Sequence, residues 1–275
     1  MNNILVPTDF SEHSEIAIEF ALQIANKSTD QVTLLNVFDV PELSDSWIQN
    51  DYDHPWEEVL KNAKADLKDK MVKLSKKYTT NVKIICQIAA GIPLEDILKL
   101  QEEENFDLLI LGVKKNNDIG SYLFGTFTDR LVHRSSIPVL VIKERKKISD
   151  IKKMVLGHEF KANDSELEEN ITKINSFTNV KVELLRVNTP SDFMSEDVFD
   201  KRVEELKKNK EFDNCTFASI NFKNPGDGLL YHAARHKFDM IAIGDKRTST
   251  LRRWVLGEDL AEHVMDYTSL PVMIF

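Results

Sequence analysis

The feature that most constrains this chain of 275 residues is a repeat, because the same short motifs occur twice along it. Residues 105–112 and 237–244 both contain Phe-Asp, then four apolar residues, then glycine. Residues 136–142 and 269–275 both consist of serine, an apolar residue, proline and an apolar run. An internal repeat of this length indicates two copies of one structural unit. The sequence therefore predicts two similar domains, residues 1–146 and 150–275, joined within the charged stretch 143–152.

Within each copy, short apolar runs alternate with amphipathic segments. Runs that are apolar or β-branched throughout are typical of strands buried on both faces of a parallel sheet. The amphipathic segments between them are typical of helices that cover such a sheet. This alternation predicts right-handed crossovers and a doubly wound α/β fold for each copy. In the first copy the predicted strands are residues 4–7, 31–38, 82–89, 108–111 and 139–142, and the predicted helices are residues 14–26, 56–76, 93–101 and 120–133.

The formal net charge of −9 bears on the partners that the chain can have. Such a charge repels nucleic acid and anionic membrane surfaces, so neither is expected as a partner. No basic and apolar leader opens the sequence, and no apolar run is long enough to span a bilayer. Cys86 and Cys215 lie far apart in predicted strands, which favours neither a disulfide framework nor a metal site. Together these features favour a cytoplasmic location.

Candidate ligand-binding residues follow the predicted strands of the first copy. In an open α/β sheet, ligands bind beyond the carboxyl ends of the strands, near a reversal of strand order. Glycines there let the backbone approach a ligand, and free amides at a helix start favour anionic oxygens. A carboxylate accepts hydrogen bonds from ribose hydroxyls or from an adenine amino group. This combination indicates a nucleotide site formed by Pro7, Thr8, Asp9, Val37, Gly112, Lys115, Gly125 and Thr126.

These segments resemble the universal stress protein family. The resemblance covers nearly all of residues 1–143 and, more weakly, residues 150–275. It is carried by residues 4–11, Gly91-Ile92-Pro93, Phe106-Asp107 and the loop from Gly112 to Gly125-Thr126. It implies two Rossmann-like domains of the adenine nucleotide α-hydrolase type, and a stress-responsive regulatory protein rather than an enzyme. It also implies binding of ATP, with magnesium, or of a related adenine nucleotide.

The resemblance assigns roles to individual residues. The family's Gly-x2-Gly-x9-Gly-(Ser/Thr) signature falls on Gly112, Lys115, Gly125 and Thr126. Its aspartate after the first strand falls on Asp9. Family positions that line the adenosine and phosphate pocket fall on Pro7, Thr8, Val37, Leu111 and Phe127.

Departures from the signature set the two copies apart. Lys115 stands where the second glycine is expected, and its side chain either blocks the phosphate position or adds charge to it. In the second copy Glu258 replaces the hydroxyl residue, and a carboxylate repels phosphate at close range. The sequence therefore predicts a nucleotide site in the first copy and a degenerate one in the second. The other second-copy equivalents are Gly157, Glu159, Gly244, Arg247 and Gly257.

A purely structural interpretation accounts for the same residues. Gly112 and Gly125 are also expected where a turn needs positive φ or a helix packs closely on the sheet. Asp9 with Ser11 is also expected to cap the first helix. On that interpretation the chain is a nucleotide-free scaffold for protein–protein interaction.

Two enzymatic or metal-binding alternatives have weaker support. ATP hydrolysis needs a metal-ligand set or a general base that the sequence does not reveal. His232 and His236 have a spacing that can bind metal, but no third ligand is evident and solvent-exposed histidines are commoner. Both alternatives therefore rank below nucleotide binding and the scaffold.

The ends of the two copies predict how they pair. Each copy finishes in an apolar strand, residues 139–142 and 272–275, and native proteins pair or cover such strands at a sheet edge. The resemblance implies pairing through these last strands, which commonly joins two chains in the family. We therefore expect an intramolecular pseudo-dimer with the last strands side by side and antiparallel. A further homodimer and a protein partner of unknown identity stay open.

Overall fold

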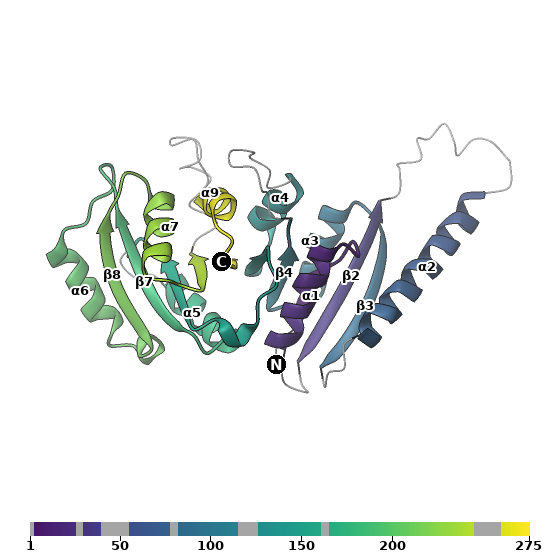
Figure 1. The fold of residues 1–275 in the computed structure, drawn as a ribbon, viewed down its shortest axis with the longest axis horizontal. Helices are drawn as coiled ribbons and strands as arrows, with labels where there is room; N and C mark the ends of the chain where they lie inside the picture. The colour runs from purple at the N-terminus through teal and green to yellow at the C-terminus, as the bar shows by residue number, and fades with distance from the viewer. Residues whose placement is uncertain are drawn as a thin grey trace.

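The computed structural model describes residues 3–25, 30–39, 55–77, 82–114, 126–160, 165–244 and 260–275. In these ranges the strands form one ten-stranded sheet with the order β3-β2-β1-β4-β5-β10-β9-β6-β7-β8. The first half of the chain lies on one side of Figure 1 and the second half on the other. The strands of the first half are β1 (Asn3–Pro7), β2 (Gln31–Asp39), β3 (Lys83–Gly91), β4 (Leu108–Gly112) and β5 (Val139–Ile142). Those of the second half are β6 (Lys153–Gly157), β7 (Lys181–Asn188), β8 (Cys215–Asn221), β9 (Met240–Ile243) and β10 (Val272–Ile274).

Helices cover both faces of this sheet. One face packs against apolar side chains of α1 (Glu12–Ile24), α2 (Pro55–Lys77), α5 (Ser165–Phe177) and α6 (Glu196–Leu206). The other face packs against α3 (Pro93–Glu103), α4 (Thr126–Arg134), α7 (Pro225–Arg235) and α9 (Leu260–Tyr267). Two short 3-10 helices, η1 (Ile148–Asp150) and η2 (Lys210–Phe212), lie in connections. This three-layer arrangement is that of a doubly wound fold.

The strands and helices predicted for the first half are confirmed, with small differences at their ends. The first helix begins at Glu12 rather than at residue 14, because Ser11 is its N-cap and accepts a hydrogen bond from the backbone N–H of Ser14. It ends at Ile24 rather than at residue 26. Of the last predicted helix, the described part begins at Thr126 and is helical.

The two halves of the sheet have the same topology. β1 pairs in parallel with β2 and β4, and β6 pairs in parallel with β7 and β9. From the centre outward, the order β5-β4-β1-β2-β3 corresponds to β10-β9-β6-β7-β8. The doubly wound α/β fold predicted for both copies is confirmed, whereas the domain limits 1–146 and 150–275 stay a prediction.

β5 and β10 join the two halves at the centre of the sheet. They run antiparallel, with Val139 opposite Ile274 and Val141 opposite Val272. Every residue of both strands is buried. The apolar core on each face of the sheet also contains residues from both halves. The predicted antiparallel pairing of the last strands is therefore confirmed.

The charged segment 143–152 is packed against both halves. Arg145 forms an ion pair with Glu12 of α1 at 2.9 Å. The ammonium group of Lys146 donates a hydrogen bond to the backbone oxygen of Asp239, also at 2.9 Å. The segment is thus a connection that docks onto both halves.

A buried polar side chain in α3 provides a test of the core. Gln101 is 6% exposed, and neither its amide oxygen nor its amide nitrogen has a hydrogen-bond partner among the described residues. An unsatisfied buried amide costs about 1–3 kcal/mol. We expect Gln101→Leu to raise the free energy of unfolding by about 1–2 kcal/mol in urea denaturation, because it removes the polar atoms at similar volume.

The matched control for this substitution is Gln23→Leu. The Gln23 side chain donates to the backbone oxygen of Glu19 and accepts from the backbone N–H of Ile148. Its removal is therefore expected to lower stability rather than raise it. A loss of stability in Gln101→Leu as well would show that the Gln101 amide is satisfied in the folded chain.

Candidate functional site

The predicted site residues of the first half lie around the carboxyl ends of β1, β2 and β4. β1 lies between β2 and β4 in the sheet. The helices that follow β1 and β4 in the chain, α1 and α4, pack on opposite faces of the sheet. β1 and β4 therefore flank the point at which the strand order reverses, where ligands bind in open α/β sheets.

Thr8 follows β1 directly and is held on several sides. It is 5% exposed, and its hydroxyl lies 3.0 Å from the hydroxyl of Ser14 and accepts from the backbone N–H of Phe10. Because the Ser14 hydroxyl donates to the Ser11 carbonyl, the Thr8 hydroxyl is the donor to Ser14. The backbone oxygen of Thr8 accepts a hydrogen bond from the Asn36 side chain at 2.6 Å. Thr8 thus ties the end of β1 to the start of α1 and to β2.

Asp9 is exposed next to this buried group. Its carboxylate accepts a hydrogen bond from the backbone N–H of Ser11 at 2.9 Å. Partial burial raises the pKa of Asp9, but the hydrogen bonds of the turn, above all those from the Ser11 side chain and backbone, lower the pKa by more, so it lies below the ordinary value. The carboxylate is therefore charged at neutral pH. Asp9 does not cap α1, because Ser11 does so; it fixes the turn that leads into the helix.

The turn after the central strand is bent in the same way in both halves. Phe10 has a φ of 62° and Phe160, at the corresponding position, a φ of 56°. A positive φ in a residue other than glycine costs about 1–3 kcal/mol and marks a constraint on the backbone. Since both halves have the bend, it belongs to the fold and not to one ligand site.

Gly112 is required by close packing. A Cβ atom at this position would lie 1.7 Å from the backbone oxygen of His13 in α1. The close approach of α1 to the end of β4 therefore explains the glycine without any ligand, as the structural interpretation predicts.

The other residues of the predicted site are placed in the core, on α4 or outside the described residues. Val37 of β2 and Leu111 of β4 pack with the apolar core on the α3 and α4 face. Phe127, in the first turn of α4, is 39% exposed. Thr126 is the first residue of α4, and its side chain is not among those described. Lys115 and Gly125 lie outside the described residues.

Asn36 is the residue of this region that the sequence analysis missed. It lies in β2, is 7% exposed, and donates to the backbone oxygen of Thr8. Its side-chain oxygen has no hydrogen-bond partner in the described part of the chain. The signal that could have revealed it is a polar amide inside an apolar strand run, because buried amides need partners.

Arg186 corresponds to Asn36 in the second half. Asn36 follows Leu35, which lies opposite Pro7 at the end of β1. In the same way, Arg186 follows Leu185, which lies opposite Gly157 at the end of β6. Arg186 is 3% exposed and its guanidinium donates to the backbone oxygen of Glu159 at 3.0 Å. The guanidinium also pairs with the carboxylate of Asp192 at 2.8 Å and donates to the side-chain oxygen of Asn188 at 3.3 Å.

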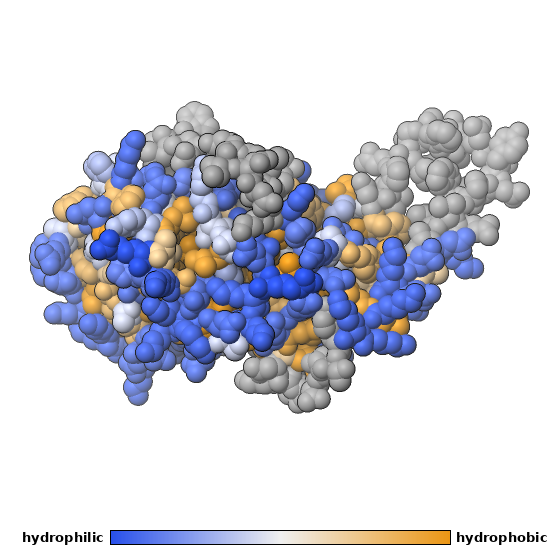
Figure 2. Space-filling model, in the orientation of Figure 1, coloured by the Kyte–Doolittle hydropathy of each residue, from blue (hydrophilic) through white to orange (hydrophobic). Residues whose placement is uncertain are grey.

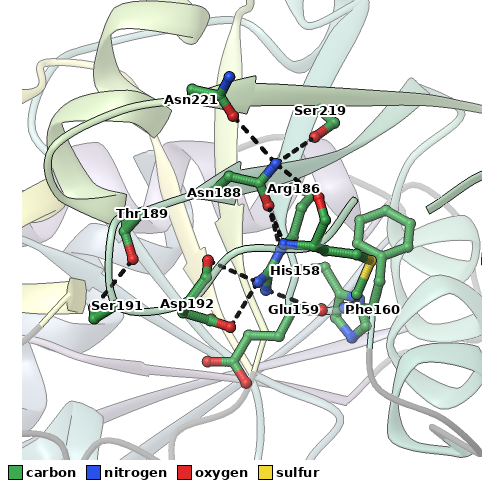
Figure 3. A network of polar contacts seen from close by, with 11 residues as sticks. His158, Glu159, Phe160, Arg186, Asn188, Thr189, Ser191, Asp192, Ser219 and Asn221 are labelled. Atoms are coloured by element: carbon green, nitrogen blue, oxygen red, sulfur yellow. Dashed lines mark hydrogen bonds and ion pairs between the residues drawn. The ribbon is translucent and has the colours of Figure 1, made fainter. Parts of the chain in front are cut away.

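Figure 3 shows this guanidinium between the turn after β6, which carries Glu159, and the turn after β7, which carries Asp192. Asn188 extends the network, since its side chain accepts from the backbone N–H of Met194 and donates toward Ser219 and Asn221. The carboxyl edge of β6 and β7 is thus filled by contacts within the chain. Of the second-half signature positions, Gly244 is described, whereas Arg247, Gly257 and Glu258 lie outside the described residues.

His232 and His236 stack against each other, with ring centroids 4.4 Å apart. His232 is 5% exposed, and its Nε2 lies 2.5 Å from a carboxylate oxygen of Glu183. The expectation of solvent-exposed histidines is therefore wrong for His232. Over the described residues, no group of three His, Cys, Asp or Glu side chains is arranged to hold a metal ion.

The two cysteines lie in strands, as predicted, and neither forms a disulfide. Cys86 is in β3 and Cys215 in β8. Burial raises the pKa of the Cys215 thiol to about 11. This thiol is therefore protonated near neutral pH, which argues against a role as a nucleophile.

The outer surface has the mixed polar and apolar character of a globular domain. Figure 2 shows apolar residues scattered among hydrophilic ones on the face in view, as on ordinary globular domains. None of the helices in the described ranges has the length and apolar character needed to cross a bilayer.

Comparison with known proteins places the chain in a family. The model of the universal stress protein family matches residues 1–143. Two universal stress proteins of Methanocaldococcus jannaschii are 32% and 28% identical to this chain. Each alignment covers 52% of this chain, together with 94% of the first relative and 83% of the second. The crystal structure of a universal stress protein from Archaeoglobus fulgidus has the same fold, with a TM-score of 0.71 at 19% identity, covering 99% of this chain and 95% of that one. Since the family model matches more than half of its residues, this chain belongs to the universal stress protein family.

Proposed function

We propose that the first domain, residues 1–146, binds an adenine nucleotide, ATP foremost, and that the second, residues 150–275, does not. The observation that carries the proposal is the position of Asp9 and Gly112. Asp9 follows β1 and Gly112 ends β4, and these are the two strands that flank the reversal of strand order. Family membership supports a stress-responsive regulatory role in the cytoplasm, rather than a catalytic one.

Each residue has a separate task in this proposal. Asp9, held charged by its low pKa, accepts hydrogen bonds from ribose hydroxyls. Gly112 ends β4, and the nucleotide lies beyond the carboxyl end of that strand. The phosphates lie at the amino-terminal end of α4, where free backbone N–H groups and the Thr126 hydroxyl favour anionic oxygens. Lys115 adds a positive charge, and magnesium enters with the phosphates.

Thr126→Glu tests this assignment. A carboxylate at the first position of α4 suits the helix dipole, so the fold should be kept, but it repels phosphate at close range. ATP in large excess over its Kd should raise the Tm of the wild-type chain, because a ligand that binds only the folded state stabilises it. We expect this ATP-dependent rise to be lost in Thr126→Glu, measured by differential scanning fluorimetry with and without magnesium.

The matched control is Ser165→Glu, which makes the same kind of change at the first residue of α5. It should leave the ATP-dependent rise in Tm unchanged. Retained ATP stabilisation in Thr126→Glu would remove Thr126 from the phosphate site.

A nucleotide-free interaction scaffold is the second candidate. One observation favours it: close packing alone accounts for Gly112, and the turn into α1 alone accounts for Asp9. Mass spectrometry of the purified chain distinguishes the two functions. An adenine nucleotide released on denaturation supports the first function, and an ATP titration of the wild-type chain without any rise in Tm supports the second.

A further inference from the structure

The helices at the two ends of the molecule carry opposite charges. α2 lies at the end formed by β3, and α6 at the end formed by β8 (Figure 1). α2 contains seven lysines and four acidic residues, a net charge of +3, whereas α6 contains five acidic and two basic residues, a net charge of −3. We propose that α2 of one chain docks through its lysines against the carboxylates of α6 in a second copy of this chain. This contact does not depend on the proposed nucleotide binding.

Three lysines of α2 form an exposed stripe, the lysine stripe, which consists of Lys61, Lys64 and Lys68. Their spacing of three and four residues places them on one side of the helix. All three are exposed, and none has an ion-pair or hydrogen-bond partner among the described residues. Like charges at this spacing repel one another. A surface that brings negative charges to the stripe therefore relieves this repulsion.

The lysine stripe faces away from the rest of the first half. Lys70 Nζ lies 5.6 Å from the centre of the Phe10 ring, and Lys77 pairs with Glu15 of α1. Lys70 and Lys77 are seven residues apart, so the side of α2 that they share faces α1. Lys68 precedes Lys70 by two residues, or about 200° around the helix. The stripe therefore faces outward, past the edge strand β3.

α6 has a matching row of carboxylates, the acidic stripe, which consists of Glu196, Asp200 and Glu204. These residues are four apart, so they too share one side of their helix. All three are exposed, and in the described part of the chain they have no ion-pair or hydrogen-bond partner. Each end of the molecule thus presents unpaired charges of a single sign.

The two stripes correspond in position and in length. Each helix connects the second strand of its half to the third, so α2 and α6 occupy equivalent places. Viewed down the helix axis, each stripe lies on the same side of the buried residues, which include Met71 in α2 and Val203 in α6. The lysine stripe extends over about 11 Å of helix and the acidic stripe over about 12 Å. Each stripe can therefore contact the whole of the other.

The contact also involves the two edges of the sheet. β3 and β8 end the ten-stranded sheet, so one edge of each has no strand partner among the residues that the structure describes. Native proteins pair, cover or charge such edges. Docking of α2 on α6 brings β3 of one chain toward β8 of the next and covers both. Because the two surfaces differ, the contact is heterologous and joins copies head to tail.

A second copy accounts for both stripes, whereas other partners account for only one. A net charge of −9 repels nucleic acid and anionic membranes, and neither explains the acidic stripe. α2 also offers a membrane no apolar side, because Met71 and Leu74 are buried. The net charge repels a second copy as well. At about 0.1 M salt, however, charges more than about 10 Å apart are largely screened, and the charges of touching stripes are closer than that.

The test is sedimentation velocity of the full-length chain over a range of protein concentrations. We expect a monomer in dilute solution and reversible association at high concentration in about 0.1 M NaCl, lost at about 1 M NaCl because salt screens exposed ion pairs. Lys64→Glu with Lys68→Glu reverses the charge of the lysine stripe, and Asp200→Lys with Glu204→Lys that of the acidic stripe. Each double variant should associate at least about 10-fold more weakly than wild type.

A mixture of the two double variants separates the stripes from other surfaces. The reversed stripe of each variant then meets an unchanged stripe of opposite charge on the other. The mixture should therefore associate at concentrations at which neither variant does so alone. If a reversed variant does not fold, the neutral variant Lys64→Gln with Lys68→Gln should still weaken association.

Lys99→Glu with Lys173→Glu is the matched control. It changes the net charge as much as reversal of the lysine stripe does, but on α3 and α5, where each lysine belongs to an ion pair within its own helix. It should associate as wild type does. Loss of association in this control as well would overturn the proposal, because net charge and not the stripes would then govern association.

Two further results would overturn the proposal. Association that persists in both reversed variants, or at the higher salt concentration, would show that another surface joins the copies. A wild-type chain that stays monomeric at every concentration would show that a second copy is not the partner. Binding of a polyglutamate peptide by that monomer, measured by fluorescence anisotropy, would assign the lysine stripe to an acidic partner instead.

Discussion

Met273→Asp is expected to abolish the folded monomer, because it places a charge in the strand pair that joins the two halves. Met273 lies in β10, is 0% exposed and is opposite Leu140 of β5. Burying an unpaired carboxylate costs several kcal/mol, a large part of the roughly 5–15 kcal/mol that stabilises a domain. We expect a loss of at least about 4 kcal/mol in the free energy of unfolding.

The same substitution should change the association of the chain. When β10 no longer pairs, the backbone groups of β5 are left at a sheet edge, and such an edge pairs with other chains. We therefore expect dimers or aggregates in size-exclusion chromatography with light scattering. Deletion of residues 272–275 should have the same effect.

Tyr267→Asp is the control, because Tyr267 ends α9 close to the same strand but is 52% exposed. It should change the free energy of unfolding by less than about 1 kcal/mol and leave the chain monomeric. A monomeric Met273→Asp chain of wild-type stability would show that the β5–β10 pair does not hold the halves together.

The pairing of the halves could be predicted because it depends on strands that are apolar throughout. Such runs mark buried strands without any knowledge of their neighbours, and two of them at the ends of a repeat leave few alternatives. The packing of the connecting segment could not be predicted in this way. It depends on Glu12 and on the backbone of Asp239, which are distant in sequence and carry no motif.

The start of α1 shows where local signals are insufficient. Ser11 and Ser14 both suit an N-cap, and in the structure Ser11, which directly follows the bend at Phe10, is the cap. A positive φ at a phenylalanine has no signature in the sequence, because it is imposed by the hydrogen bonds of the turn.

The position of the candidate site in the fold could be predicted, but the contacts of its residues could not. Asp9 and Gly112 were predicted at strand ends, and the carboxyl ends of neighbouring parallel strands necessarily meet at one edge of the sheet. The reason for the glycine is the backbone of His13, which reaches it only in the folded chain. Asn36 was missed because one polar residue in an apolar run does not reveal which of its atoms will lack a partner.

Arg186→Met is expected to lower the free energy of unfolding by about 3 kcal/mol, because it takes a buried charged donor away from acceptors in the turns after β6 and β7. The carboxylate of Asp192 is 39% exposed and can regain water. The backbone oxygen of Glu159 and the side-chain oxygen of Asn188 lose a donor at a buried edge. Arg186→Lys should recover little of the loss, since an ammonium group cannot bond to several acceptors in the fork geometry of a guanidinium.

The control for this network is Arg202→Met in α6. Arg202 pairs with Glu205 one turn further along the same helix, and its side chain is 31% exposed. Such a pair contributes less than about 0.5 kcal/mol. Urea denaturation of the two variants therefore separates a buried network from a surface ion pair. If Arg186→Met lost no more stability than Arg202→Met, the contacts of Arg186 between the turns after β6 and β7 would contribute no more than a surface ion pair.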